Sequence, residues 1–190
     1  MPEVKSFPIF YPPDGLYYIF SKDYGHFWRQ RGTDWEGAII DCEPLGQVRE
    51  GNTMDNRIWK VTTTRPATNK LGPRVTLQSA LAPQESESED AVGFVSKKSG
   101  KVIPSNKKAS WTLIGHGMKP FAYKIVTNDL RISINAPMHS AMDPKSELHA
   151  EFHVTSAYDM RVYDPQWWYF IPVGQIDGFL SANGIQRAGK

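Results

Sequence analysis

The chain of 190 residues contains one cysteine, Cys42, and has no strong excess of either charge. A single thiol excludes an internal disulfide framework and a zinc site built on cysteines. Lysine and arginine number 22 and aspartate and glutamate 20, which gives a net charge of +2. This near-balance argues against a nucleic-acid-binding protein and against a polybasic membrane binder, because both carry a clear basic excess.

Long apolar segments are missing as well. No apolar run approaches the roughly 20 residues that a helix needs to cross a bilayer. Residues 1–6 lack the basic and apolar regions of a secretory signal peptide. These absences predict a cytoplasmic protein, and release by a route without a sequence signal is the alternative.

Helical periodicity is scarce, whereas short strand-like runs recur along the chain. The 14 prolines and 15 glycines are spread throughout, and they interrupt every helical spacing of apolar residues. Aromatic and β-branched residues instead gather in runs such as 16–20 and 167–171, and apolar residues alternate with polar ones over 130–134 and 148–154. The pattern predicts an all-β barrel or sandwich of about a dozen strands.

Two polar segments depart from this pattern. Residues 84–90 are acidic and contain almost no apolar side chain, which predicts a surface loop. Residues 181–190 are small and polar, and we expect them to fray.

No catalytic signature is recognisable, and no enzyme, metal or cofactor is expected. Cys42 lies in an apolar strand between Asp41 and Glu43, whose charges would raise its pKa, so we expect a buried and unreactive thiol. The three side chains of His149, Glu151 and His153 would share one face of a strand. A solvated polar face is the preferred interpretation of that trio over a metal site.

Three tryptophans recur in the same local setting. Trp59, Trp111 and Trp168 are each followed two positions later by an apolar residue, and about 50–57 residues separate them. Each closes a block that opens with a strand-like run, at 15–19, 74–77 and 120–126. Three blocks of about four strands predict a barrel with pseudo-threefold symmetry, in which the tryptophans fill the common axis.

These blocks resemble a β-trefoil of twelve strands in a single domain. The implied division of residues 1–190 is an N-terminal arm at 1–14, repeats at 15–64, 74–116 and 120–173, and a tail at 174–190. Residues 166–168, Gln-Trp-Trp, resemble the Gln-x-Trp signature of ricin-type trefoils. Residues 15–19, 42–46, 57–59 and 162–168 resemble the mycocypins (clitocypins and macrocypins), which are fungal β-trefoil inhibitors of cysteine proteases.

The mycocypin resemblance implies that two loops of the first repeat occlude the active-site cleft of a papain-like cysteine protease. The loop at 22–26 contributes Lys22, Asp23, Tyr24 and Gly25, and the loop at 45–56 contributes Gly46, Gln47, Val48, Arg49, Gly51 and Asn52. Preformed loops on a rigid barrel lose little entropy on docking. The loop at 81–91 lacks the asparagine with which relatives inhibit legumain, so that activity is not expected.

Carbohydrate binding is the alternative function. Trefoil lectins stack an aromatic ring on a sugar and bond its hydroxyls with aspartate or asparagine. The matching pairs here are Asp34 with Trp35, Asp159 with Tyr163, and Asp23 with Tyr24. A third hypothesis is a non-catalytic interaction or defence protein, in which residues 7–13 form a docking arm. None of the three involves nucleic acid or a membrane.

Overall fold

The computed structural model describes ten stretches of the chain, at residues 9–21, 25–31, 39–44, 56–69, 71–82, 93–98, 101–116, 121–135, 149–152 and 167–182. Twelve strands and one short α-helix lie in these stretches. The strands are β1 (Gly15–Ser21), β2 (His26–Arg31), β3 (Ile39–Pro44), β4 (Ile58–Arg65), β5 (Arg74–Ser79), β6 (Phe94–Lys98), β7 (Lys101–Ser105), β8 (Trp111–Gly115), β9 (Ala122–Val126), β10 (Ile132–Asn135), β11 (His149–Phe152) and β12 (Trp168–Pro172). The chain then forms a 3₁₀ turn, η4 (Val173–Gln175), and the helix α1 (Ile176–Ala182).

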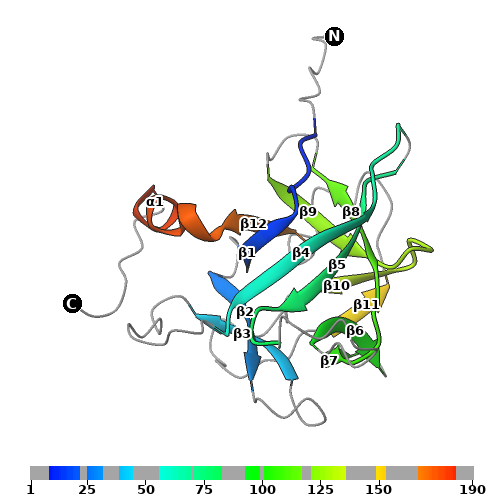
Figure 1. The fold of residues 1–190 in the computed structure, drawn as a ribbon, viewed down its shortest axis with the longest axis horizontal. Coiled ribbons are helices and arrows are strands. Elements are labelled where there is room, and N and C mark those ends of the chain that lie inside the picture. The colour runs from blue at the N-terminus through cyan, green and yellow to red at the C-terminus, as the bar shows by residue number, and fades with distance from the viewer. Residues whose placement is uncertain are drawn as a thin grey trace.

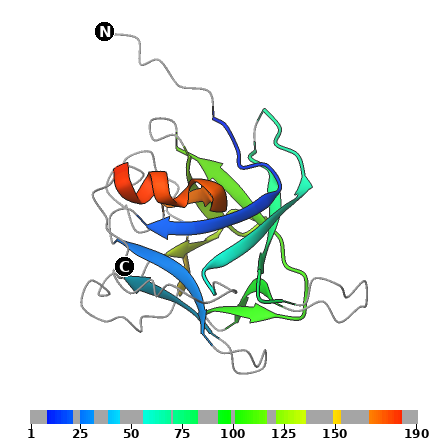
Figure 2. The ribbon, with the colours of Figure 1, turned by 60° about the vertical axis from the view of Figure 1, so that its left-hand side comes forward.

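Six strands close into a barrel (Figure 1, Figure 2). Strand β1 pairs with β4, β4 with β5, β5 with β8, β8 with β9, β9 with β12, and β12 again with β1. Every one of these pairings is antiparallel. Closure leaves no unpaired edge among the six strands, so the backbone N–H and C=O groups around the ring have hydrogen-bond partners in the neighbouring strands.

The other six strands form three hairpins, each inserted between two barrel strands of one block. The hairpins are β2–β3, β6–β7 and β10–β11, and they join the barrel through β1, β5 and β9. Each block therefore repeats the order barrel strand, hairpin, barrel strand. The fold is a β-trefoil. This confirms the all-β trefoil that the sequence predicted.

The three repeated tryptophans occupy equivalent places in the barrel. Within its block, each tryptophan pairs across the ladder with the same position of the first strand. The pairs are Trp59 with Tyr17, Trp111 with Val75, and Trp168 with Tyr123. All six side chains belong to one buried core cluster. The equivalence predicted for the three tryptophans is confirmed.

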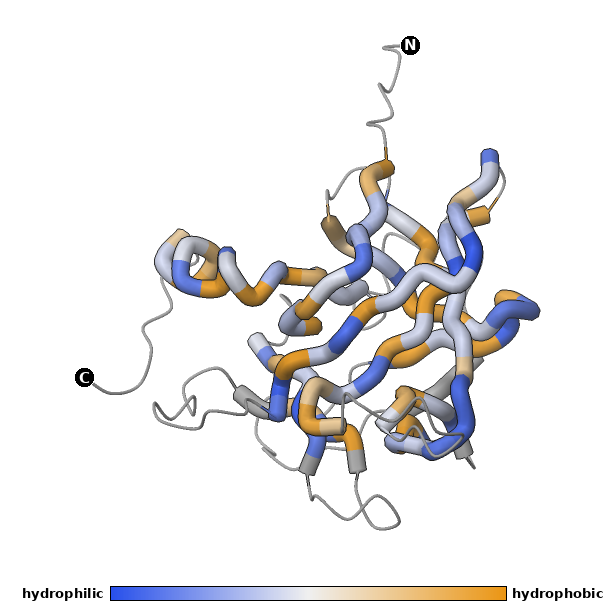
Figure 3. Tube along the Cα trace, in the orientation of Figure 1, coloured by the Kyte–Doolittle hydropathy of each residue, from blue (hydrophilic) through white to orange (hydrophobic). Residues whose placement is uncertain are grey.

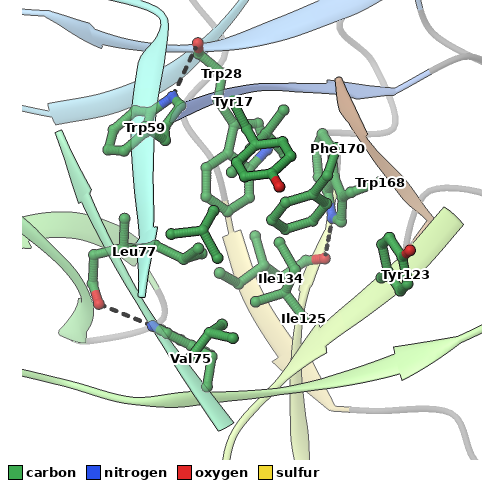
Figure 4. Packing of buried hydrophobic residues seen from close by; sticks show 14 of the residues in the cluster. Tyr17, Trp28, Trp59, Val75, Leu77, Tyr123, Ile125, Ile134, Trp168 and Phe170 are labelled. Carbon is green, nitrogen blue, oxygen red and sulfur yellow. Dashed lines mark hydrogen bonds between the residues drawn. The ribbon is translucent and has the colours of Figure 1, made fainter. Parts of the chain in front are cut away.

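A repeated hydrogen bond ties each hairpin to its barrel strand (Figure 4). The indole Nε1 of each tryptophan donates to a backbone carbonyl on the second strand of its own block. The bonds run from Trp59 to Trp28 at 3.4 Å, from Trp111 to Val95 at 2.9 Å and from Trp168 to Ile134 at 2.9 Å. A buried indole thus keeps its donor satisfied while its ring fills the barrel.

The first block departs from the symmetry at Trp28. The other blocks place Val95 and Ile134 at this position, whereas Trp28 makes edge contacts with Trp59 and Trp168 at ring-centre distances of 5.8 and 5.2 Å. The Trp28 side chain is fully buried. The larger ring fills space between the first and third blocks and makes the three repeats physically distinct.

The C-terminal helix was not expected from the sequence, which assigned this region to a tail. Helix α1 lies against β1 and β12 (Figure 2). Ile176 and Leu180, one helical turn apart, are buried in a second cluster with Phe20, Phe27 and Ile171. Seven residues are too few for a stable isolated helix, so tertiary packing holds this one. No helix in the ten stretches is long and apolar enough to cross a membrane.

The N-terminal arm plugs one opening of the barrel. The Tyr11 ring stacks on Tyr123 with 5.8 Å between ring centres. The Tyr123 hydroxyl donates to the Phe10 carbonyl, and the Tyr17 hydroxyl donates to the Pro13 carbonyl at 2.7 Å. The arm thus packs on the barrel along Phe10–Pro13, although the ring of Phe10 is 66% exposed.

Candidate functional site

The first hairpin carries a bidentate ion pair on the face opposite Trp28 and Cys42. Arg29 on β2 and Asp41 on β3 stand opposite each other in the ladder. Arg29 Nε donates to Asp41 Oδ1 at 3.0 Å, and Nη2 donates to Oδ2 at 2.8 Å. The Asp41 side chain is fully buried, so its carboxylate strengthens the hairpin and is closed to a ligand from solvent.

Cys42 is buried in the main core cluster. Burial raises the pKa of its thiol far above the ordinary range; the charge of Asp41 raises it further, and Arg29 acts in the opposite direction. A thiol in this state is a poor nucleophile and a poor metal ligand. The predicted burial of Cys42 is confirmed.

Three buried polar atoms lie on one face of the first block. Ser21 at the end of β1 pairs with His26 at the start of β2, and Trp28 follows on the same face of β2. The Ser21 hydroxyl, His26 Nδ1 and Trp28 Nε1 have no hydrogen-bond partner within the part of the chain described. Burial lowers the pKa of His26, which favours the neutral imidazole.

The third block holds a buried cationic and aromatic cluster. Trp167, the middle residue of the Gln-Trp-Trp motif, is only 1% exposed. Lys124 Nζ lies 5.1 Å from the centre of its ring, and the His116 ring meets it edge-on at 4.5 Å. Lys124 is itself fully buried. Because its faces are covered, Trp167 cannot stack on a sugar in this conformation.

The two loops of the predicted protease wedge start from neighbouring strand ends. His26 opens β2 after the first loop, and Pro44 closes β3 before the second. These two residues pair in the ladder. Gly25 has a left-handed backbone with φ of 65°, and its N–H donates to the Ser21 carbonyl at 2.8 Å. Of the residues predicted for the wedge, Gly25 alone is described; Lys22, Asp23, Tyr24, Gly46, Gln47, Val48, Arg49, Gly51 and Asn52 lie outside the described stretches.

The predicted sugar-binding residues also lie outside these stretches. They are Asp34, Trp35, Asp159 and Tyr163. By position in the sequence, the first pair belongs to the connection between β2 and β3, and the second pair to the connection between β11 and β12. The acidic segment at 84–90 and residues 183–190 are likewise not described.

The predicted histidine face is described in part. His149 and Glu151 lie on β11, where they pair with Asn135 and Ser133 of β10. His153 lies beyond the end of β11, among residues that are not described. Within the ten described stretches, no group of three or more His, Cys, Asp or Glu side chains is placed to hold a metal ion.

Sequence reasoning missed Lys124 and the pairing of Arg29 with Asp41. Lys124 has a visible signal, because it is the single charged residue in the apolar run 121–126. The ion pair has no such signal, since its two residues meet only through the register of the hairpin.

No protein-family model matches the chain, and no curated protein matches it in sequence. Solved structures do match. The ricin B-like lectin of Macrolepiota procera, in complex with lactose, superposes with a TM-score of 0.56 at 16% identity over 85% of this chain and 98% of the lectin. The Rhizoctonia solani agglutinin gives 0.57 at 21% identity, over 87% of this chain and 99% of the agglutinin. The designed threefold-symmetric protein ThreeFoil gives 0.54 at 14% identity, over 84% of this chain and all of ThreeFoil.

At these identities the likeness establishes the fold alone, a β-trefoil, over most of the chain. It does not distinguish the mycocypins among trefoil families. Membership in that family and protease inhibition therefore stay predictions.

Proposed function

We propose that this trefoil is a carbohydrate-binding protein without catalytic activity. The observation that carries the proposal is the near-complete structural coverage of fungal lectins, one of them holding lactose. A shared fold does not transfer a function by itself, so the proposal also needs residues suited to sugars. Two of the three aspartate and aromatic pairs identified in the sequence are the candidates, Asp34 with Trp35 and Asp159 with Tyr163.

The connections between strands support fewer than three sugar sites. Residues 32–38, which connect β2 to β3, contain Asp34 and Trp35, and residues 153–167, which connect β11 to β12, contain Asp159 and Tyr163. The corresponding connections of the second block, residues 99–100 and 106–110, contain neither an aspartate nor an aromatic residue. A two-residue turn has no room for both an acidic and an aromatic side chain beside the hairpin. We therefore place the sugar sites in the first and third blocks, where the two candidate pairs occur.

A glycan array probed with the labelled full chain tests the proposal, followed by calorimetry with each glycan that binds. Trp35→Ala should abolish binding at the first block, and Tyr163→Ala at the third, because each removes the ring that stacks on the sugar. Phe10→Ala is the control, since it removes an exposed aromatic ring in the N-terminal arm. Failure of every glycan to bind, or unchanged affinity in both variants, would exclude this function.

Inhibition of papain-like proteases is the second candidate. The pairing of His26 with Pro44 favours it, because this pairing brings the ends of both wedge loops together. Val48→Asp should weaken papain inhibition, since an unpaired charge would be buried against the protease.

Gly25→Trp is unsuitable as the test of the wedge. Gly25 has a positive φ, so a bulky residue there would strain the fold as well as the interface. Gly25→Asn tolerates this backbone and serves as the folding control. Absence of papain inhibition at micromolar concentration, or equal inhibition by Val48→Asp, would remove this candidate.

A further inference from the structure

Four large apolar side chains are exposed around the plugged opening of the barrel. They are Ile9 (45% exposed), Phe10 (66%), Leu71 (41%) and Phe121 (60%), and we call them the apolar collar. The described stretches contain one other exposed large apolar side chain, Leu16, which lies on the wall of the barrel where β1 pairs with β4. Exposed apolar groups that gather in one place usually mark an interaction surface.

The contacts of the N-terminal arm show that the collar belongs to one end of the barrel. A side chain at Gly115, at the end of β8, would clash with Ile9. The ideal Cβ position of Gly72, the residue after Leu71, lies 3.0 Å from the Tyr11 hydroxyl. The hydrogen bond from Tyr123 holds Phe10 close to the start of β9, directly after Phe121. The arm, the residues just before β5 and the end of β8 thus lie at the same end of the barrel (Figure 1, Figure 3).

Contacts with the barrel hold the N-terminal part of the collar, and Phe121 is held at a conformational cost. Stacking and hydrogen bonds fix the arm from Phe10 to Pro13. Phe121 has a left-handed backbone with φ of 64°, which is unfavourable for a residue with a large side chain. The fold thus retains a strained residue that presents an aromatic ring to solvent, a combination typical of functional positions.

Basic residues accompany the collar, although the whole chain is nearly neutral. Arg65 and Arg74 pair across the β4–β5 ladder, before and after the turn that carries Leu71, and residues 65–74 contain no acidic residue. The nearby Asp14 carboxylate accepts a hydrogen bond from the Thr63 N–H at 2.7 Å. The two arginines therefore place positive charge beside the part of the collar that carries Leu71.

We propose that this end of the barrel docks on the surface of a membrane that contains anionic phospholipid. Apolar side chains enter the boundary between headgroups and acyl chains, while neighbouring lysine and arginine side chains attract anionic headgroups. A second copy of the chain fits less well, because a twofold interface would place each basic segment against its own copy. The proposal is separate from carbohydrate binding and requires no sugar.

Vesicle flotation with the full chain tests this docking. Wild type should float with phosphatidylcholine vesicles that contain about 30% phosphatidylserine, and not with pure phosphatidylcholine vesicles. The double variant Leu71→Ser, Phe121→Gly should lower the partition coefficient by about tenfold. Arg65→Gln should lower it by about fivefold, the effect of one basic residue near an anionic surface.

Two features of the experiment distinguish a loss of membrane docking from a loss of folding. Glycine relieves the backbone strain at position 121, so the double variant should keep its melting temperature. Leu16→Ser is the matched control, because Leu16 is 42% exposed, almost the same as Leu71, and lies outside the collar. It should float as the wild type does.

Two results would overturn the proposal. One is a wild type that does not float with the anionic vesicles, or a double variant that floats as well as wild type. The other is a concentration-dependent dimer in light scattering that the double variant abolishes, without any vesicle binding, since that would assign the collar to a second copy of the chain.

Discussion

Replacing each symmetric tryptophan by phenylalanine measures what the repeated hydrogen bond contributes to the trefoil. Trp111 and Trp168 donate over 2.9 Å, whereas Trp59 donates over 3.4 Å, close to the limit for such a bond. Phenylalanine keeps an aromatic ring in the barrel but removes the N–H. The Val95 or Ile134 carbonyl would then lose its side-chain donor.

The expected cost has two parts. A buried group left without its hydrogen bond costs about 1–3 kcal/mol, and the smaller ring adds a packing cost that is similar at all three sites. We expect Trp111→Phe and Trp168→Phe each to lower the free energy of unfolding by about 2–4 kcal/mol. Trp59→Phe should cost about 1 kcal/mol less, because its bond is longer and weaker.

Urea unfolding followed by far-ultraviolet circular dichroism measures these differences. For each variant, the slope of the free energy of unfolding against urea concentration is compared with that of the wild type. Trp167→Phe is the control, because Trp167 is equally buried and its Nε1 has no partner within the described part of the chain. If Trp111→Phe is no more destabilising than Trp167→Phe, or if Trp59→Phe is the most destabilising of the three, the argument is wrong.

Three further predictions concern single positions. Gly72→Ala should lower the melting temperature by several degrees, because its Cβ would overlap the Leu113 carbonyl; Gly174→Ala, which meets nothing within 4 Å, should leave it unchanged. Burial lowers the pKa of His26 below the roughly 6.5 of the unfolded chain, so the unfolded chain binds more protons. The contribution of neutral His26 to the free energy of unfolding is complete above about pH 6.5 and is lost as the pH falls through the folded-state pKa of His26. The urea midpoint of the wild type should show this pH dependence, and the midpoint of His26→Gln should show it more weakly. Cys42 should react with Ellman's reagent only in denaturant, and rapid labelling of the native protein would contradict its burial.

Local sequence signals predicted the strands and the repeat. Apolar and aromatic runs identified β1, β5, β9 and β12, and the recurring Trp-x-apolar pattern identified the last strand of each block. These features depend on residues within a few positions of one another in the sequence, so they can be recognised without knowledge of the fold. The helix α1 had no comparable signal, because its seven residues gain their stability from contacts with β1 and β12.

The candidate sites were predicted only as residue types in loops. Their arrangement depends on contacts between distant segments, and most of the residues named from the sequence lie outside the described stretches. Gly25 illustrates the limit: the sequence marked it as a loop glycine, and the backbone adds that its φ of 65° requires glycine or a residue tolerant of that region.

The sequence alone determined an all-β chain of three blocks, each ending in a buried tryptophan, because side-chain periodicity and repetition are properties of short segments. The tertiary structure decided the closure of the barrel, the pairing of Arg29 with Asp41 and the exposure of the apolar collar. Each of these depends on contacts between separate segments: the register of the barrel is fixed when its six strands pair, and that of Arg29 with Asp41 is fixed by the β2–β3 ladder.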